Sequence, residues 1–408
     1  MSGTGDQGTG GPGGAGAPTD AGSAAGANTT APDSGSTPAG VAETKPPSRR
    51  DAILRVGIVV GVLVVVFGII LPRYIDYQAV FETIQGLTIQ QFLIVGVFGL
   101  IAWVLTGAIF AELIPGLGFI RGTQAYLILT GIGASIPLGP WNMAVLWVVI
   151  RGWGLPTQTT TGGILLYGIF DQLSRFGLMA VAGVFLFIAE GLNRGVSVET
   201  GLIVAFMVVG LGLFILLGGG LVLVVRSERL ARKLGQIAER VVGAVLRRLG
   251  RTVPDIEGSL VKFRVTLGDT VQERGVASFI TAMLSKFAWA LLMIVSMRVV
   301  GVPEQELPLS IIFAGVAAVF VITVLPISPG GAGVPDLLYI SFYTTYTGGA
   351  DSSAIGAAVM LFRSFQWFFP IPISWILLGI SRRGKSLLPT KAEFSGSEPI
   401  PNVAPVSS

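Results

Sequence analysis

Residues 309–346 read LSIIFAGVAAVFVITVLPISPGGAGVPDLLYISFYTTY, with a cluster of prolines and glycines between two apolar arms. Proline and glycine are the poorest helix formers, so this pattern predicts two short helices separated by a break. Backbone outside a helix is tolerated at membrane depth only where protein or a wet cavity surrounds it. We therefore expect the unit 307–346 to be a re-entrant hairpin. Alternatively, these residues only kink ordinary membrane helices, in which both are common.

The whole chain has the composition of a membrane protein. Of its 408 residues, 51% are hydrophobic and 12% are charged, and the mean hydropathy is +0.75. Soluble domains carry about 25% charged residues. The chain contains no cysteine and no histidine, which excludes disulfides, thiol nucleophiles, His/Cys zinc sites and Ser-His-Asp chemistry. We expect no enzyme activity, no catalytic residue, no metal, no cofactor and no nucleic-acid partner.

Apolar runs approach or exceed the roughly 20 residues that cross a bilayer as a helix. We expect six full spans, at residues 52–71, 91–114, 162–190, 201–225, 276–300 and 354–380. A second unit with short apolar arms, 118–151, contains SIPLGPWN at its middle and predicts a second re-entrant hairpin. The expected fold is an all-α polytopic membrane protein.

The composition also divides the chain into five segments. Residues 1–50 have almost no large apolar side chain, which predicts a disordered tail. The first transmembrane half, a basic loop, the second transmembrane half and another disordered tail follow at 51–225, 226–275, 276–385 and 386–408. Lysine and arginine concentrate before the first span, in the loop and after the last span. The positive-inside rule places all three in the cytoplasm, so we expect a multi-pass protein of the inner or plasma membrane.

This orientation requires each hairpin to enter and leave on the same side of the membrane. The first does so on the cytoplasmic side and the second on the outer side. The two halves also share an order of residues. Pro140 precedes Arg175 by 35 residues, and Pro329 precedes Arg363 by 34. Similar halves with opposite entry sides predict an inverted-topology repeat, which many transporters contain.

Four charged residues lie deep in the expected spans: Asp171, Arg175, Lys286 and Arg363. Each costs about 2.5–3.5 kcal/mol on insertion scales and usually faces a partner or a cavity. Asp171 and Arg175 are spaced to pair on one helical face, and Asp336 or Glu112 could reach the other two cations. The excess of cations predicts a site for an anionic group, most simply a phosphate. The alternative is a set of interhelical ion pairs that hold the bundle together.

The basic loop contains SERLARKLGQIAERVVGAVLRRLG, at residues 227–250, in which an apolar stripe faces arginine and lysine. This pattern predicts an amphipathic helix on the anionic cytoplasmic leaflet. A plain connection between the two halves is the alternative.

The stretch PGGAGVPDLLYISFYTTYTGGADSSAIGAAVMLFRSFQWFFPIPISW, residues 329–375, resembles the terminal signature of a known family. The family is the lysylphosphatidylglycerol synthase transmembrane region, whose members are flippase-like integral membrane proteins. The matching residues are Pro329, Gly330, Gly331, Gly333, Asp336, Phe362, Arg363 and Pro370. A looser similarity surrounds Asp171 and Arg175, and the resemblance covers about residues 52–385.

The resemblance implies the translocation half of such proteins, without the soluble aminoacyl-transferase domain. The protein would move an anionic phospholipid or a polyprenyl-phosphate-linked lipid between leaflets. Arg363, Arg175 and Lys286 would hold the phosphate, and Asp171 and Asp336 would position these cations. The hairpin residues Pro329, Gly330, Gly331 and Gly333 would shape the turn whose N–H groups face the headgroup.

Two other functions stay open at this point. One is a non-catalytic membrane subunit that recruits or supports a cytoplasmic, envelope-modifying enzyme through the basic loop. The other is an intramembrane transferase that acts on lipid-linked substrates.

Overall fold

The computed structural model describes residues 77–135, 141–192, 200–229, 256–324, 333–350 and 352–383, with Gly331 and a few residues between 232 and 240. All of them belong to one of the two units of the chain, residues 45–408. The expected span 52–71, the tails 1–50 and 386–408, and most of the expected amphipathic helix lie outside the described residues. So do Pro329 and Gly330.

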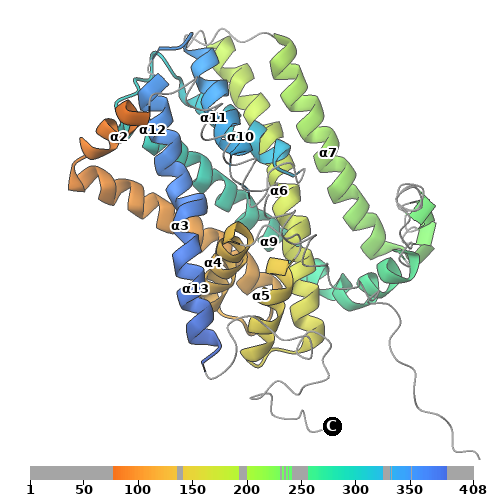
Figure 1. Cartoon of the computed structure of the whole chain (residues 1–408). Helices are drawn as coiled ribbons and strands as arrows, with labels where there is room; N and C mark the ends of the chain where they lie inside the picture. The colour runs from red at the N-terminus through yellow and green to blue at the C-terminus, as the bar shows by residue number, and fades with distance from the viewer. Residues whose placement is uncertain are drawn as a thin grey trace, which may run out of the picture. The chain divides into compact units, whose positions relative to one another are not determined.

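The described chain is helical, with no strand among these residues (Figure 1). Its elements, in order, are α2 (Tyr77–Gln85), α3 (Ile89–Leu113), α4 (Phe119–Ser135), α5 (Trp141–Gly152), α6 (Thr157–Gly191), α7 (Thr200–Arg226), α9 (Ile256–Val299), α10 (Leu309–Ile322), α11 (Val334–Tyr346), α12 (Ser352–Arg363), η4 (Ser364–Phe368) and α13 (Pro370–Ser381).

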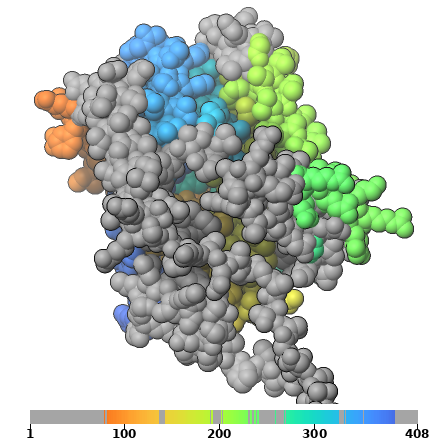
Figure 2. All heavy atoms as spheres, turned by 45° about the vertical axis from the view of Figure 1, so that its right-hand side comes forward, coloured from red at the N-terminus to blue at the C-terminus, as the bar shows by residue number. Residues whose placement is uncertain are grey.

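Five helical runs are long and apolar enough to cross a membrane: Ile89–Leu113, Thr157–Ala189, Ile203–Arg226, Thr270–Val299 and Ser352–Ser381. They match five of the six predicted spans, and the sixth falls outside the described residues. For the described residues this confirms an all-helical fold with helices long and apolar enough to cross a membrane. The apolar segment of α7 is only 17% buried, and its side chains form an outer surface of the described chain (light green, Figure 2). Such an apolar outer surface suits a lipid environment.

Helix α9 begins at Ile256, well before the predicted span 276–300, and is 44 residues long. It therefore takes in the last part of the segment that we expected to be a loop. Residues 256–275 alternate charged and apolar side chains and contain no proline. Nothing in them ends a helix, whereas a search for apolar runs detects only the later half.

The helices pack closely because glycine lets their backbones touch. Helix α3 packs along α9 and α4, and α6 packs along α7 and α9. A Cβ atom on Gly107 of α3 would lie 2.3 Å from the Thr123 Cα of α4. A Cβ on Gly131 would lie 2.0 Å from the Pro370 carbonyl oxygen, so α4 also meets α13 at its backbone. Small residues serve the same purpose in membrane helix pairs generally.

Two pairs of short helices lie between the long helices along the chain, at the two units in which the sequence predicts a break. Helix α4 contacts α5, and α10 contacts α11. The arms contain 17, 12, 14 and 13 residues. At 1.5 Å per residue each arm is about 18–26 Å long, which is less than the roughly 30 Å hydrocarbon core. In Figure 1 the α10–α11 pair lies at the upper end of the helices and the α4–α5 pair at the lower end.

The last span contains a single π-helical turn, η4, directly after Arg363. Pro370 follows, and it can neither donate a hydrogen bond to residue 366 nor fit an undisturbed α-helix beside that carbonyl. The Phe369 N–H donates instead to the Ser364 carbonyl at 2.8 Å, five residues back. The Phe365 carbonyl accepts from the Trp103 indole at 2.7 Å. The widened turn is thereby held in place by α3.

Candidate functional site

Asp171 joins two long helices through two cations. Its Oδ2 lies 2.9 Å from Arg175 Nε, one turn further along α6, and its Oδ1 lies 2.5 Å from Lys286 Nζ on α9. Arg175 Nη1 also donates to the Phe320 carbonyl at 3.2 Å and to Thr323 Oγ1 at 3.1 Å. These acceptors lie at the C-terminal end of α10, where the helix dipole favours a positive charge. The cluster therefore connects α6, α9 and α10, the first helix of the α10–α11 pair.

A second cluster forms where α11 meets the π turn. Arg363 Nε donates to Asp336 Oδ1 at 2.7 Å, and Nη1 donates to Gln366 Oε1 at 2.5 Å. Arg363 Nη2 donates to the Gly331 carbonyl. The Arg363 and Asp336 side chains are only 5% and 4% exposed. Because a buried charge is costly unless it is paired and hydrogen-bonded, these contacts offset the cost of burying the Arg363 side chain.

The glycine-rich turn positions Asp336 at the start of α11. Gly331 and Gly333 have φ angles of 77° and 85°, in the left-handed region that side chains with a Cβ rarely adopt. The Gly333 N–H donates to Asp336 Oδ2 at 2.7 Å. One oxygen of this carboxylate thus caps α11 and the other pairs with Arg363. This dual use gives a physical reason for an acid three residues after the last glycine.

Both clusters contribute to the wall of one cavity of about 450 Å³, although Asp336 itself is not among its lining residues. The cavity lies between α3, α4, α5, α6, α9, α10, α11, α12 and the π turn, with Asp171, Arg175, Lys286, Gly331 and Arg363 in its wall. Aromatic and amide side chains complete the wall: Tyr126, Tyr167, Trp289, Tyr339, Gln172 and Trp367. Gln172 Oε1 is buried and has no hydrogen-bond partner in the described part of the chain. The cavity therefore combines polar, charged and aromatic surfaces.

The five ionisable groups of the two ion-pair clusters do not balance. Three cations face two carboxylates, which leaves one excess positive charge among them. The Phe320 ring partly offsets this charge through cation–π contacts, with Arg175 and Lys286 at 5.5 and 5.7 Å from its centroid. A buried excess charge remains unfavourable without a counter-charge. The electrostatics of the cavity therefore favour an anionic occupant.

The structure settles the ionic pairings that the sequence left open. Asp336 pairs with Arg363, and Lys286 pairs with Asp171. Glu112 takes neither cation, because its Oε1 accepts from Thr281 at 2.6 Å on another turn of α9. Two of the pairs, Asp171–Lys286 and Asp336–Arg363, join different helices, whereas Asp171–Arg175 lies within α6. The same contacts hold the cations at the cavity wall.

Several cavity residues were not singled out from the sequence. Gln172 directly follows Asp171, and Gln366 lies three residues after Arg363. This proximity to a charged residue was the one available signal. Trp289 comes from the middle of an apolar run and carries no such signal. Its indole donates to Thr106 Oγ1 at 3.1 Å, and the Thr106 and Ser285 hydroxyls lie 2.7 Å apart. This polar group holds the Trp289 ring at the cavity wall.

Among the described residues, no three acidic side chains come together in a way that could hold a metal ion. The chain matches no protein-family model, no curated protein and no solved structure. Functional inference therefore rests on the cavity and its charges.

Proposed function

We propose that the protein moves a lipid with a phosphate-bearing headgroup between the two leaflets, without chemical change, and that the headgroup passes through the 450 Å³ cavity. The observation that carries this proposal is the convergence of Arg175, Lys286 and Arg363, from three separate helices, on one cavity. An anionic phospholipid or a polyprenyl-phosphate-linked lipid has the required headgroup.

The arrangement of the short helices supports a transport path. In our proposal α4–α5 and α10–α11 are re-entrant hairpins of an inverted repeat, entering from the cytoplasm and from outside. Neither arm of either pair is long enough to cross the hydrocarbon core unaided. With residues 52–71 as a sixth span, both termini would be cytoplasmic, in the inner or plasma membrane. Two hairpins that meet near the bilayer midplane would leave polar backbone there.

The hydrogen bonds of Arg363 suggest how a phosphate would bind. Two of its three partners, the Gln366 amide oxygen and the Gly331 carbonyl, are neutral. A phosphate oxygen that replaced either one would form a stronger, charge-assisted bond. Asp336 would keep the guanidinium oriented through Nε throughout. Arg175 and Lys286 would receive the phosphate next, while Asp171 holds them at the opposite wall.

The π turn would allow the cavity wall to move. Helix breaks caused by proline leave backbone groups that neighbouring side chains satisfy, as Trp103 does for the Phe365 carbonyl. Gln366 and Trp367 lie on this turn and line the cavity. A small rearrangement there would change access to Arg363 without unfolding the span.

Identification of co-purifying lipids tests the proposal. The full chain and Arg363→Ala would be purified in mild detergent and their bound lipids extracted and compared by mass spectrometry. Arg121→Ala is the matched control, because this arginine is exposed on α4 and contacts Trp153 rather than the cavity. We expect one phosphate-bearing lipid to be enriched in wild type and control and lost in Arg363→Ala. Identical lipid contents in all three would contradict the proposal.

A further inference from the structure

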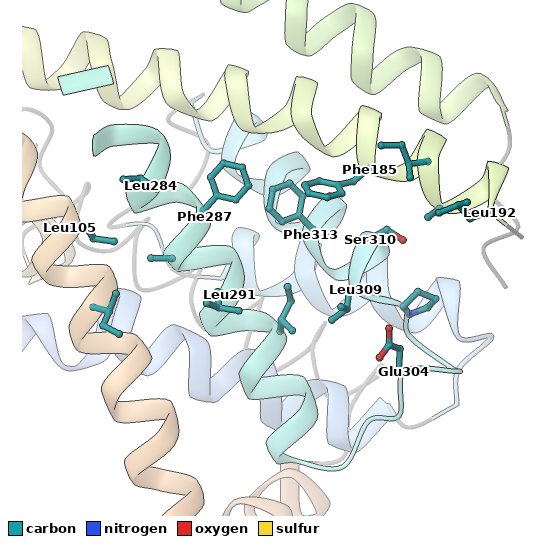
Figure 3. Close-up of a pocket in the computed structure, with 16 residues that line it drawn as sticks. Leu105, Phe185, Leu192, Leu284, Phe287, Leu291, Glu304, Leu309, Ser310 and Phe313 are labelled. Carbon is teal, nitrogen blue, oxygen red and sulfur yellow. The ribbon is translucent and has the colours of Figure 1, made fainter. Parts of the chain in front are cut away.

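A second cavity, of about 730 Å³, lies between α3, α6, α9 and α10 (Figure 3). Its wall is almost wholly apolar, with Leu105, Phe185, Leu284, Phe287, Leu291 and Phe313 among the lining residues. It shares no lining residue with the charged cavity. This volume is within the roughly 300–1,000 Å³ of typical ligand pockets. We call it the apolar groove.

The groove and the charged cavity use different faces of the same helices. On α9, Leu284, Phe287 and Leu291 recur at helical spacing along the groove, whereas Lys286 and Trp289 face the charged cavity. On α6 the groove residues begin at Phe185, ten residues after Arg175, which corresponds to about 15 Å along the helix axis. The two cavities are therefore separate sites, and an occupant of one does not fill the other.

Phenylalanine rings form the middle of the groove. The Phe313 ring centroid lies 5.2 Å from that of Phe185 and 5.4 Å from that of Phe287. The groove lies between three candidate spans and α10, so its natural surroundings are lipid chains. A segment of protein placed there would have to satisfy its backbone polar groups in hydrocarbon. A hydrocarbon chain has no such groups and fits this surface without that cost.

One end of the groove is polar. Figure 3 shows the Glu304 carboxylate and the Ser310 hydroxyl at the end near Leu309, with Leu105 and Leu284 at the other end. Ser310 Oγ is buried and has no hydrogen-bond partner in the described chain. Helix α10 begins here after Pro308, with no side-chain cap. The Ile311 and Ile312 N–H groups donate to the Pro308 carbonyl, which leaves the N–H groups of Leu309 and Ser310 without an intrahelical partner. A carboxylate and a set of hydrogen-bond donors thus lie together.

The loop that carries Glu304 is held in place by Arg298. This side chain donates to the Val302 and Leu307 carbonyls, both at 2.8 Å, and it interacts electrostatically with Glu304. The polar end therefore presents one acid, one nearby cation and the N-terminus of α10. This pattern of charge matches a headgroup that carries an amine and a phosphate together. A purely anionic headgroup would meet the Glu304 carboxylate unfavourably.

We propose that the apolar groove binds a zwitterionic phospholipid with a primary-amine headgroup. The amine pairs with Glu304, the phosphate accepts hydrogen bonds from Ser310 and the start of α10, and one hydrocarbon chain lies along Phe313, Phe287 and Leu291. This site is distinct from the path of the transported lipid. Its occupant is retained at the protein and stabilises the contact between α6, α9 and α10.

Native mass spectrometry of the full chain, titrated with synthetic dioleoyl lipids after removal of bound lipid, tests this assignment. The probes are phosphatidylethanolamine, with a primary amine, and phosphatidylglycerol, with none. A hydrogen bond that involves a charged group corresponds to about a tenfold or larger change in affinity. We expect Glu304→Gln to bind phosphatidylethanolamine about tenfold more weakly. Glu82→Gln, at an exposed acid on α2, is the matched control and should bind as wild type does.

Leu291→Trp fills the groove and should abolish binding of phosphatidylethanolamine, and an unchanged gel-filtration profile and melting temperature would establish that it is folded. Arg363→Ala should leave this binding intact, so failure at the charged cavity is distinguishable from failure here. Unchanged affinity in Glu304→Gln, or in a folded Leu291→Trp, would overturn the assignment. Equal affinity of Arg363→Ala for the two lipids would overturn it as well, because this variant impairs the charged cavity to which the proposed function assigns phosphatidylglycerol.

Discussion

Arg363 and Asp336, 27 residues apart in the chain, form a buried ion pair with 2.7 Å between Nε and Oδ1. The pair connects the end of α12 to the first turn of α11. The second carboxylate oxygen of Asp336 caps that turn. A single contact therefore fixes both the glycine-rich turn and the orientation of the guanidinium. The geometry of the turn and the charge at the cavity depend on each other.

Removal of one partner of this pair should be costly. Asp336→Ala leaves Arg363 buried without a counter-ion, and we expect a loss of about 3–5 kcal/mol in the free energy of unfolding. The combined variant Asp336→Leu with Arg363→Met replaces both charges by apolar groups and should recover much of that stability. Unfolding in detergent, followed by circular dichroism, measures both. A combined variant less stable than Asp336→Ala would contradict the ion-pair account.

Asp171 and Lys286 should respond unequally to substitution. Asp171→Asn leaves two cations without their carboxylate, whereas Lys286→Met keeps the Asp171–Arg175 pair intact. We expect Lys286→Met to cost about 1.5–3 kcal/mol, as for one hydrogen bond to a charged group, and Asp171→Asn to cost more. Melting temperatures of the two variants, compared under one condition, give the order. The reverse order would mean that Asp171 is not the shared anchor.

The glycine turn offers a local test of backbone geometry. Gly333 has a φ of 85°, and alanine there should cost about 1–2 kcal/mol because an L-side chain strains this region. Gly96→Ala on α3 is the control, since a Cβ there meets no atom within 4 Å and its φ is ordinary. It should be neutral or slightly stabilising. Equal effects of the two substitutions on the melting temperature would show that the turn does not require glycine.

The re-entrant topology can be tested because the chain has no cysteine. Single cysteines at the exposed positions Arg121 and Gln158, in the first turns of α4 and α6, mark the two ends of the α4–α5 unit, and those at Gln305 and Ala350 flank α10–α11. An impermeant maleimide added to intact cells should label the second pair of sites and not the first. Permeabilised cells should show labelling at all four. Labelling of only one member of either pair in intact cells would mean that the unit spans the membrane.

The apolar pattern predicts much of the fold, because a lipid environment requires long apolar helices and penalises non-helical backbone that faces lipid. Five spans and both interruptions lie where hydropathy, proline and glycine indicate. The start of α9 was missed because charged residues interrupt the apolar ones in 256–275, so that this stretch contains no continuous apolar run. The π turn was missed too, because it depends on how Pro370 is accommodated within one span.

The site was only partly predictable. Spacing along one helix identifies the Asp171–Arg175 pair, since residues four apart lie on one face. The pairing of Arg363 with Asp336 and of Lys286 with Asp171 depends on the packing of four helices, and local spacing could not choose between Asp336 and Glu112. Trp289 and Trp367 became cavity residues only through tertiary packing. The apolar groove likewise has no signature in the sequence, because its residues come from four elements.

The central claim is that Arg175 and Arg363 carry the headgroup of a transported anionic lipid. It is tested most directly by lipid translocation in proteoliposomes that contain a fluorescent phosphatidylglycerol or a polyprenyl phosphate. Wild type and the exposed control Arg121→Ala should move the lipid at equal rates, and the combined Arg175→Ala and Arg363→Ala variant, folded by gel filtration, should fall to the rate of protein-free vesicles. Transport that persists at the wild-type rate in the combined variant would contradict the account.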